Sequence, residues 1–158
     1  GNIGFIGFHI SNFLLSQGVE VIGIDNQNNY YDVMLKSNRL KILEKYEHFT
    51  FHKEDLSDKE IIDLVINKYS DVTHIIHLAA QAGVRYSISD PHAYIKSNFE
   101  AKLNILEIAK NLAKLKSLIY ASSSSVYGNN QSIPFKIDQK LTSPLSLYAA
   151  TKIGGEAM

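Results

Sequence analysis

The sequence of 158 residues has no cysteine, no excess charge of either sign and no long apolar run. The absence of cysteine excludes a disulfide framework, a thiolate zinc site and a cysteine nucleophile, and it fits a cytoplasmic location. No apolar run approaches the roughly 20 residues that a membrane-spanning helix needs. We therefore expect no membrane partner.

The balance of charge excludes a further class of partner. Sixteen basic residues match sixteen acidic ones, so no net field attracts the protein to nucleic acid. Glu44 and Glu47 interrupt the basic residues of one predicted helix, which are Lys36, Arg39, Lys41 and Lys45. This pattern predicts a solvated helix face, so we expect a small-molecule partner and no nucleic acid.

Strand-like and helix-like stretches alternate along the whole chain. The pattern predicts helices at residues 8–17, 33–46, 59–69, 90–112 and from 147 onwards, and strands at 19–24, 49–52, 73–78 and 117–121. Strands separated by helical crossovers run parallel, so this is an α/β chain with a doubly wound parallel sheet. Ligands of such sheets bind beyond the carboxyl ends of the strands, where the polar segment 128–146 forms a flanking loop.

Three glycines, Gly1, Gly4 and Gly7, form a G-x-x-G-x-x-G series that leads into the first predicted helix. Such glycines let a pyrophosphate approach the backbone at a helix N-terminus, although the series alone fits a simple tight turn equally well. Asp25 follows the next strand at about the spacing of an acid that accepts both ribose hydroxyls. Because Asn26 follows it where an arginine would accommodate a 2′-phosphate, NAD is favoured over NADP.

Other polar residues also follow or occupy strands. Asp55, after the strand at residues 49–52, either accepts the adenine amino group or serves as a solvated cap. His74 and His77 have the spacing of metal ligands on a helix, but they lie in a predicted strand, where residues three apart point to opposite faces. We therefore expect no metal site.

Tyr148 and Lys152 lie four residues apart on a predicted helix, so their side chains share one face. A tyrosine with an unperturbed pKa of about 10 is a poor base at neutral pH, and a neighbouring ammonium lowers that pKa by stabilising the phenolate. The serine run 122–125, at the end of the last predicted strand, offers a hydroxyl to the reacting oxygen. A surface helix pair and a polar strand-to-loop junction are the simpler alternatives.

Five segments, in order and spanning nearly the whole chain, carry a family resemblance: GNIGFIGFH (1–9), GIDNQNNYYD (23–32), HLAAQAGVRYS (77–87), YASSSSVYG (120–128) and SLYAATK (146–152). Together they resemble the extended short-chain dehydrogenases/reductases, specifically the nucleotide-sugar epimerases, which implies a Rossmann-like fold. The resemblance implies the catalytic set Ser123, Tyr148 and Lys152, because the family's Ser or Thr lies three residues before the Val of a Val-Tyr-Gly signature. The NAD contacts that it implies are Gly1, Gly4, Phe5, Ile6, Gly7, Asp25, Asn26, Asp55, Leu56, Leu78, Ala79, Ala80, Asn98, Tyr148 and Lys152.

The reaction implied by this resemblance is a 4-epimerisation. Tyr148 takes the proton of the sugar C4 hydroxyl while NAD⁺ takes the hydride, and the 4-keto sugar rotates before the hydride returns. The runs 29–32 and 81–87 most resemble UDP-glucuronate 4-epimerases, which implies a UDP-sugar substrate converted from UDP-glucuronate to UDP-galacturonate. Ser124, Ser125 and Arg85 are the implied substrate residues, and Arg85 either faces the sugar carboxylate or lies on the surface.

Alternatives within and outside this family remain. Dehydratases and decarboxylases of the family have an acid just before the Val-Tyr-Gly signature, where this chain has Ser125, so elimination lacks its expected group. Another epimerisation, a related dehydratase or decarboxylase, and a non-catalytic NAD sensor are the competing functions.

Family members are about twice as long as this chain. We therefore expect residues 1–158 to be an NAD-binding domain truncated at both ends, without the first strand of the sheet or the C-terminal substrate domain. Such a chain is expected to bind NAD weakly and to have negligible activity. The resemblance also implies a homodimer at full length, formed through helices at residues 93–112 and from 147 onwards.

Overall fold

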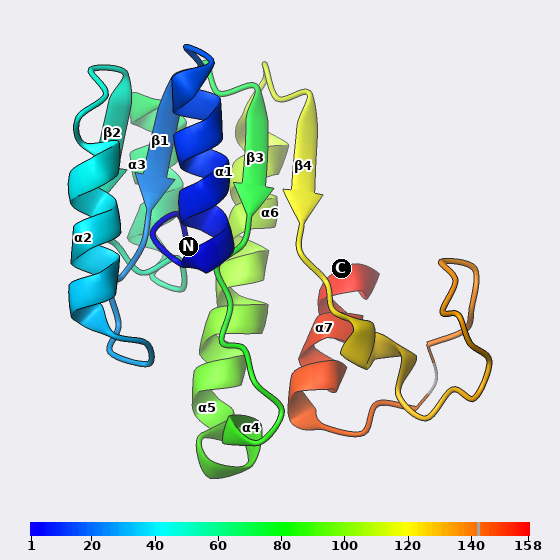
Figure 1. Cartoon of the computed structure of the whole chain (residues 1–158). Helices are drawn as coiled ribbons and strands as arrows, with labels where there is room; N and C mark the ends of the chain where they lie inside the picture. Colours follow the sequence, from blue (N-terminus) through cyan, green and yellow to red (C-terminus); the bar gives the residue numbers. More distant parts are fainter. Residues whose placement is uncertain (142) are drawn as a thin grey trace.

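The computed structural model describes residues 1–141 and 143–158, so Thr142, within the predicted loop 128–146, lies outside it. Parallel strands flanked by helices confirm the predicted α/β architecture (Figure 1). None of the described helices has the length and apolar character needed to cross a membrane. In chain order the elements are α1 (Phe5–Ser16), β1 (Val21–Ile24), α2 (Val33–Leu43), β2 (Phe49–His52), α3 (Glu60–Lys68), β3 (His74–His77), α4 (Tyr86–Ser89), α5 (Pro91–Tyr94), the π-helix η1 (Ile95–Glu100), α6 (Ala101–Asn111), β4 (Ser117–Tyr120), the 3₁₀-helix η2 (Ser124–Tyr127) and α7 (Leu147–Ala157).

All the predicted helices and strands are present, and most of their ends shift by a few residues. Helix α1 begins at Phe5, three residues before the predicted start, because the extended residue Gly4 serves as its N-cap. It ends before Gly18, whose φ of 78° suits a glycine after a helix. The apolar periodicity did not indicate the short helices α4 and η2, which each span a single turn.

The predicted helix at residues 90–112 consists of three consecutive segments, α5, η1 and α6. Asp90 begins it as expected, because its side chain accepts a hydrogen bond from the backbone N of Ala93 at 3.2 Å. The middle segment is a π-helix, a rare conformation that is frequently found at functional sites. It includes Asn98, whose side chain is buried.

The strands form two parallel pairs, β1 with β2 and β3 with β4. In a parallel strand the N–H and C=O of one residue point to the same side, and successive residues alternate. Residues 21 and 25 bond to the β2 segment, and residues 73 and 77 bond to the β4 segment. The backbone groups of residues 22 and 24 in β1 therefore face those of residues 74 and 76 in β3 across an open space.

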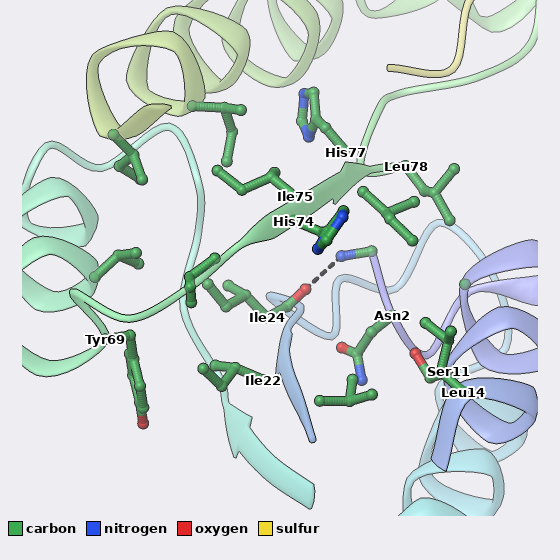
Figure 2. Close-up of a pocket in the computed structure, with 18 of the residues that line it drawn as sticks. Asn2, Ser11, Leu14, Ile22, Ile24, Tyr69, His74, Ile75, His77 and Leu78 are labelled. Carbon is green, nitrogen blue, oxygen red and sulfur yellow. Dashed lines mark hydrogen bonds between the residues drawn. The ribbon is translucent and has the colours of Figure 1, made fainter. Parts of the chain in front are cut away.

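A cavity of about 730 Å³ occupies this space between β1 and β3 (Figure 2). Its lining is mostly apolar and includes Ile22, Ile24 and Ile75. At one end the N-terminal amine of Gly1 donates a hydrogen bond to the carbonyl of Ile24. The side-chain N and O atoms of Asn2 are buried there and make no hydrogen bond with the described residues. The sheet is therefore open at its centre, where the sequence led us to expect a missing strand.

Helices α3 and α6 lie on one face of the sheets and helices α1 and α2 on the other (Figure 1), and an apolar cluster packs beneath each pair of helices. Helices α3 and α6 cover the first face, where Ile24, Ile75 and Leu118 of the strands pack against the buried residues Leu56, Ile61, Val65, Ala101, Ile105, Ile108 and Leu112. Helices α1 and α2 cover β1 and β2 on the second face. There Val21, Phe49 and Phe51 pack against the buried residues Ile3, Leu15 and Leu43. Because the strands are parallel within each pair and both pairs point the same way (Figure 1), the carboxyl ends of all four strands lie at one edge, which carries the candidate site.

Candidate functional site

The glycine turn lies at the carboxyl ends of β1 and β3. A side chain at Gly1 would place its Cβ 2.6 Å from the backbone N of Ala79, just after β3. At Gly7 a Cβ would lie 2.1 Å from the carbonyl oxygen of Gly1. Neither position has room for a side chain, so the glycines are required for the turn to pack against the strand ends.

The first turn of α1 presents backbone N–H groups at the same edge. Its N-cap, Gly4, has no side chain to accept a hydrogen bond from these groups, and a Cβ there would lie 3.3 Å from the Gly1 carbonyl. Phe5 and Ile6 follow with exposed fractions of 67% and 59%. Unbonded N–H donors at the positive end of a helix dipole form an anion site, which suits a pyrophosphate.

Asp25 lies directly after β1 and is buried. Its Oδ1 accepts a hydrogen bond from the backbone N of Gln27 at 2.9 Å, and its Oδ2 lies 3.4 Å from the Gly1 amine. Lys36 of α2 approaches Oδ1 at 3.9 Å and donates to the backbone and side-chain oxygens of Asn28 at 3.0 and 2.9 Å. Lys36 is only 6% exposed, so the prediction of a solvated basic helix face is wrong for this residue.

Asp55, after β2, connects the loops that follow β1 and β2. Its Oδ2 accepts a hydrogen bond from Asn26 at 3.1 Å and lies 3.4 Å from the ammonium of Lys96. Its Oδ1 accepts two hydrogen bonds from Ser57, from the backbone N at 3.0 Å and from the hydroxyl at 2.6 Å. Burial raises the pKa of Asp55, but these hydrogen bonds and Lys96 outweigh burial and lower the pKa overall. Leu56, beside it, is part of the α3/α6 core.

The segment after β3 passes the glycine turn at residues 78–80 and then enters a buried hydrogen-bond network. Asn98 of η1 accepts from the backbone N of Gln81 at 2.8 Å and donates to its carbonyl at 3.1 Å. The same amide donates to the hydroxyl of Thr151 in α7 at 2.9 Å. Asn98 therefore joins the loop after β3 to the helix that carries Tyr148. The family resemblance singled out Asn98, whereas Gln81 and Thr151 lie within the matching segments 77–87 and 146–152 but received no predicted role.

The predicted catalytic residues lie just before η2 and on α7, and these two helices pack against each other. Ser123 precedes η2, and its Oγ accepts a hydrogen bond from the backbone N of Ser125 at 3.2 Å. Tyr148 is half-buried in the first turn of α7. The ammonium of Lys152 lies 6.0 Å from the centre of the Tyr148 ring, so the two side chains share a helix face as predicted.

Lys152 is buried, with 3% of its surface exposed. Its Nζ donates a hydrogen bond to the carbonyl of Ala121, at the end of β4, at 2.9 Å. Burial, and then the charge of the neighbouring Lys102, lower the pKa of Lys152 to about 8. Its ammonium is therefore fixed beside Tyr148 and loses its proton more easily than a surface lysine does.

Tyr94 of α5 supports both Tyr148 and the loop after β3. Its ring meets that of Tyr148 edge to face, with the centres 6.0 Å apart. Its hydroxyl lies within hydrogen-bond distance of the carbonyls of Ala82, at 2.8 Å, and Gly83. Burial raises the pKa of Tyr94 to about 12, so the hydroxyl remains a donor. This loop leads to Arg85, which is exposed just before α4.

The remaining predicted residues differ in exposure. Ser124 is exposed and Ser125 is half-buried, both at the start of η2. His74 is exposed whereas His77 is 3% exposed, so the two histidines point to opposite faces of β3 as predicted. In the ranges 1–141 and 143–158, no group of three or more His, Asp or Glu side chains is arranged to hold a metal ion.

The cavity between the two sheets does not contain the predicted catalytic residues. The glycine turn and residues 78 and 79 contribute to its lining, but Ser123, Tyr148 and Lys152 do not. Figure 1 shows α7 beyond β4, on the side of the molecule away from this cavity. The predicted dinucleotide residues and catalytic residues therefore lie along the same strand-end edge, where the glycine turn and residues 78 and 79 after β3 reach the cavity.

Comparison with known proteins agrees with this geometry. The chain is 45% identical to a UDP-glucuronate 4-epimerase of Thermodesulfobacterium geofontis, and the match covers 100% of this chain and 48% of that protein. It is 48% identical to the protein CapI of Staphylococcus aureus, over 100% of this chain and 46% of the relative. The chain thus spans about half the length of these curated relatives.

A solved structure gives a similar result. The UDP-glucuronic acid 4-epimerase of Bacillus cereus, in complex with UDP-glucuronic acid and NAD, superposes with a TM-score of 0.89 at 34% identity. The superposition covers 99% of this chain and 48% of that one, and it confirms the Rossmann-like fold. The family model described as GDP-mannose 4,6 dehydratase matches residues 1–158. The chain therefore belongs to the GDP-mannose 4,6-dehydratase family of extended short-chain dehydrogenases/reductases.

Proposed function

We propose that residues 1–158 form the NAD-binding and catalytic half of a UDP-sugar 4-epimerase that converts UDP-glucuronate to UDP-galacturonate. The observation that carries this proposal is the fixed pair of Tyr148 and the buried Lys152 on α7, at the same strand-end edge as the glycine turn. A non-catalytic sensor has no need of a buried ammonium beside a tyrosine ring, because burying a charge is costly.

The residues of this edge fit a dinucleotide. The N–H groups at the start of α1 suit the pyrophosphate, and the absence of a side chain at Gly4 leaves them accessible. Asp25 is the proposed acceptor for the ribose hydroxyls, and its oxygens retain lone pairs beyond the contacts to Gln27 and Lys36. Asp55 has a lowered pKa and is the proposed acceptor for the adenine amino group.

The chain's own residues then hold and move one proton. Bound NAD⁺ would supply the hydride acceptor for the sugar C4 carbon and the donor for its return. Tyr148 accepts the C4 hydroxyl proton, and Lys152 stabilises the phenolate through its charge. Ser123 offers its hydroxyl to the same oxygen from the start of η2. Asn98 and Tyr94 position the loops around this group.

The choice of epimerisation over elimination rests on Ser125. The family model takes its description from a dehydratase, whereas the Thermodesulfobacterium geofontis relative and the Bacillus cereus structure reported above are 4-epimerases. A hydroxyl at residue 125, with its backbone N bonded to Ser123, provides no general acid for loss of water. Arg85, exposed near the site, is the proposed partner of the sugar carboxylate, and α5, α6 and α7 are the proposed surface of a homodimer.

The test is an assay of nucleotide-sugar conversion. Residues 1–158 by themselves are expected to bind NAD weakly and to have negligible turnover, and tight binding by calorimetry would contradict this. The activity assay therefore joins residues 1–158 to the second half of the Bacillus cereus enzyme, supplies NAD⁺ and separates the products by chromatography. UDP-galacturonate from UDP-glucuronate is the expected product, and UDP-xylose would refute the assignment.

The matched control in this assay is Tyr148→Phe. It keeps the ring that packs on Tyr94 and removes only the proton acceptor, so NAD affinity is expected to stay within a factor of about two. Turnover is expected to fall by roughly 10²–10⁴-fold, the usual contribution of a general base. Unchanged turnover in this variant would remove Tyr148 from the catalytic role.

A further inference from the structure

A second buried lysine lies behind the candidate site. Lys102, on α6, is 4% exposed, and its ammonium lies 3.8 Å from the centre of the Tyr120 ring. Tyr120 ends β4, one residue before the carbonyl of Ala121 that accepts the hydrogen bond from Lys152. The proposed reaction assigns no role to Lys102, although burying an ammonium is costly.

Both buried lysines approach the same aromatic ring. The ammonium of Lys152 lies 5.0 Å from the centre of Tyr120, within the range of a cation–π contact. All the ion pairs in the described part of the chain lie elsewhere, and their cations are Gly1, Lys36, Lys96 and Lys114. Two like charges therefore share one ring, and no ion pair within the described residues neutralises either of them.

The other groups around this ring do not offset the repulsion. His77 of β3 stacks on Tyr120 with the ring centres 5.7 Å apart, and burial lowers its pKa to about 3, so it is neutral at pH 7. The Tyr120 hydroxyl is buried without a hydrogen-bond partner among the described residues. Burial, then Tyr148 and the carboxylate of Glu156, raise the pKa of Tyr120, but the pKa shifts of Lys102 and Lys152 have no contribution from Glu156.

In addition to burial, the repulsion between the two ammonium groups lowers the pKa of Lys152. Burial lowers the pKa of Lys102, whereas Lys152 has its pKa lowered to about 8 by burial and, second, by Lys102 itself. We propose that Lys102 is a positioning residue: its ammonium packs on the ring of Tyr120, repels the ammonium of Lys152 from that ring, and so holds Lys152 beside Tyr148. The proposal rests on the proposed role of Lys152 but is tested without substrate or NAD.

The experiment follows lysine side-chain resonances by NMR as the pH of the purified chain is varied. In the unmodified chain one lysine is expected to titrate near pH 8, and its loss in Lys152→Met assigns it. Lys102→Met removes the neighbouring charge at similar volume, so the Lys152 midpoint is expected to rise by on the order of one unit. An unchanged midpoint in a variant with a native amide spectrum overturns the proposal.

Two further variants keep the test decisive if Lys102→Met does not fold. Lys102→Arg retains the charge, so the titration near pH 8 is expected to persist. A Lys152 midpoint that rose as far in Lys102→Arg as is expected for Lys102→Met would show that the charge of Lys102 does not act on Lys152, and would overturn the proposal. Tyr120→Phe keeps the ring and removes the unpartnered hydroxyl, so the Lys152 midpoint is expected to stay within a few tenths of a unit. Failure of the epimerase assay would leave all these titrations unaffected.

Discussion

The two faces of the sheets are covered unequally. On the α3/α6 face, seven buried residues form one cluster that extends across both strand pairs, from Ile24 in β1 to Leu118 in β4. On the α1/α2 face, three buried residues cover β1 and β2. Over β3 and β4 that second face leaves Ile76 and Ile119, which are paired in register, 36% and 55% exposed.

This difference shows what joins the two strand pairs. Because β1 and β3 have a cavity between them, no ladder of hydrogen bonds connects the pairs within the described chain. The shared core beneath α3 and α6 is the connection, since it contains residues from both pairs. The candidate site spans both pairs as well, so its geometry depends on this core.

The largest expected effect comes from removing a side chain of that core. Ile108 of α6 is 1% exposed, and Ile108→Ala is expected to lower the free energy of unfolding by about 2–5 kcal/mol. Ile119→Ala, on the exposed face of β4, is the matched control and should change stability by less than about 0.5 kcal/mol. Urea denaturation measures both. Equal losses would show that the two faces contribute equally to stability, which would contradict the difference described above.

The strands and most helix positions follow from the sequence because apolar periodicity reflects burial on a covered face. Strand β2 has the predicted ends, and the three-residue spacing of His74 and His77 in a strand correctly predicted that they lie on opposite faces of β3. The π-helix η1 could not be predicted in this way, because its residues have the same apolar period as the α-helices around it. Asn98 within η1 bonds to Gln81 and Thr151, and such contacts between distant residues leave no mark on the apolar period.

The candidate site was predicted less completely. The glycines, Asp25, Tyr148 and Lys152 have a fixed local spacing, and the structure places them along one edge. Lys36 and Lys102 approach the site residues from α2 and α6. A single sequence without relatives does not indicate which lysines of a helix point inward. Their burial depends on pairings between residues distant in the chain, which periodicity does not reveal.

A smaller expected effect, the pH dependence of the free energy of unfolding, distinguishes the two faces of β3. Burial, and then Lys102, lower the pKa of His77 from 6.5 to about 3, so the unfolded chain binds one more proton between these values. Stability from this group is complete above pH 6.5 and decreases by roughly 1.4 kcal/mol per pH unit as the pH falls toward 3.

Two single variants isolate this contribution. His77→Gln is expected to remove this part of the acid sensitivity, measured as the difference in unfolding free energy between pH 7 and pH 5.5. His74→Gln, on the exposed side of the same strand, should retain the full slope. If both variants lost the slope equally, burial on the α6 side would not be its cause.

The smallest expected effect lies outside both cores. The ammonium of Lys114 lies 2.5 Å from Asp71, and the pair joins the loops that precede β4 and β3, with side chains 64% and 81% exposed. Water and salt screen such a pair, so a double-mutant cycle of Lys114→Ala and Asp71→Ala is expected to give a coupling of at most about 0.5 kcal/mol. A coupling above about 1 kcal/mol that persisted in 0.5 M salt would contradict the view that the buried core, and not surface charge, holds the strands together. It would mean that β3 and β4 are held together at their amino ends by surface charge, in addition to the core beneath α6.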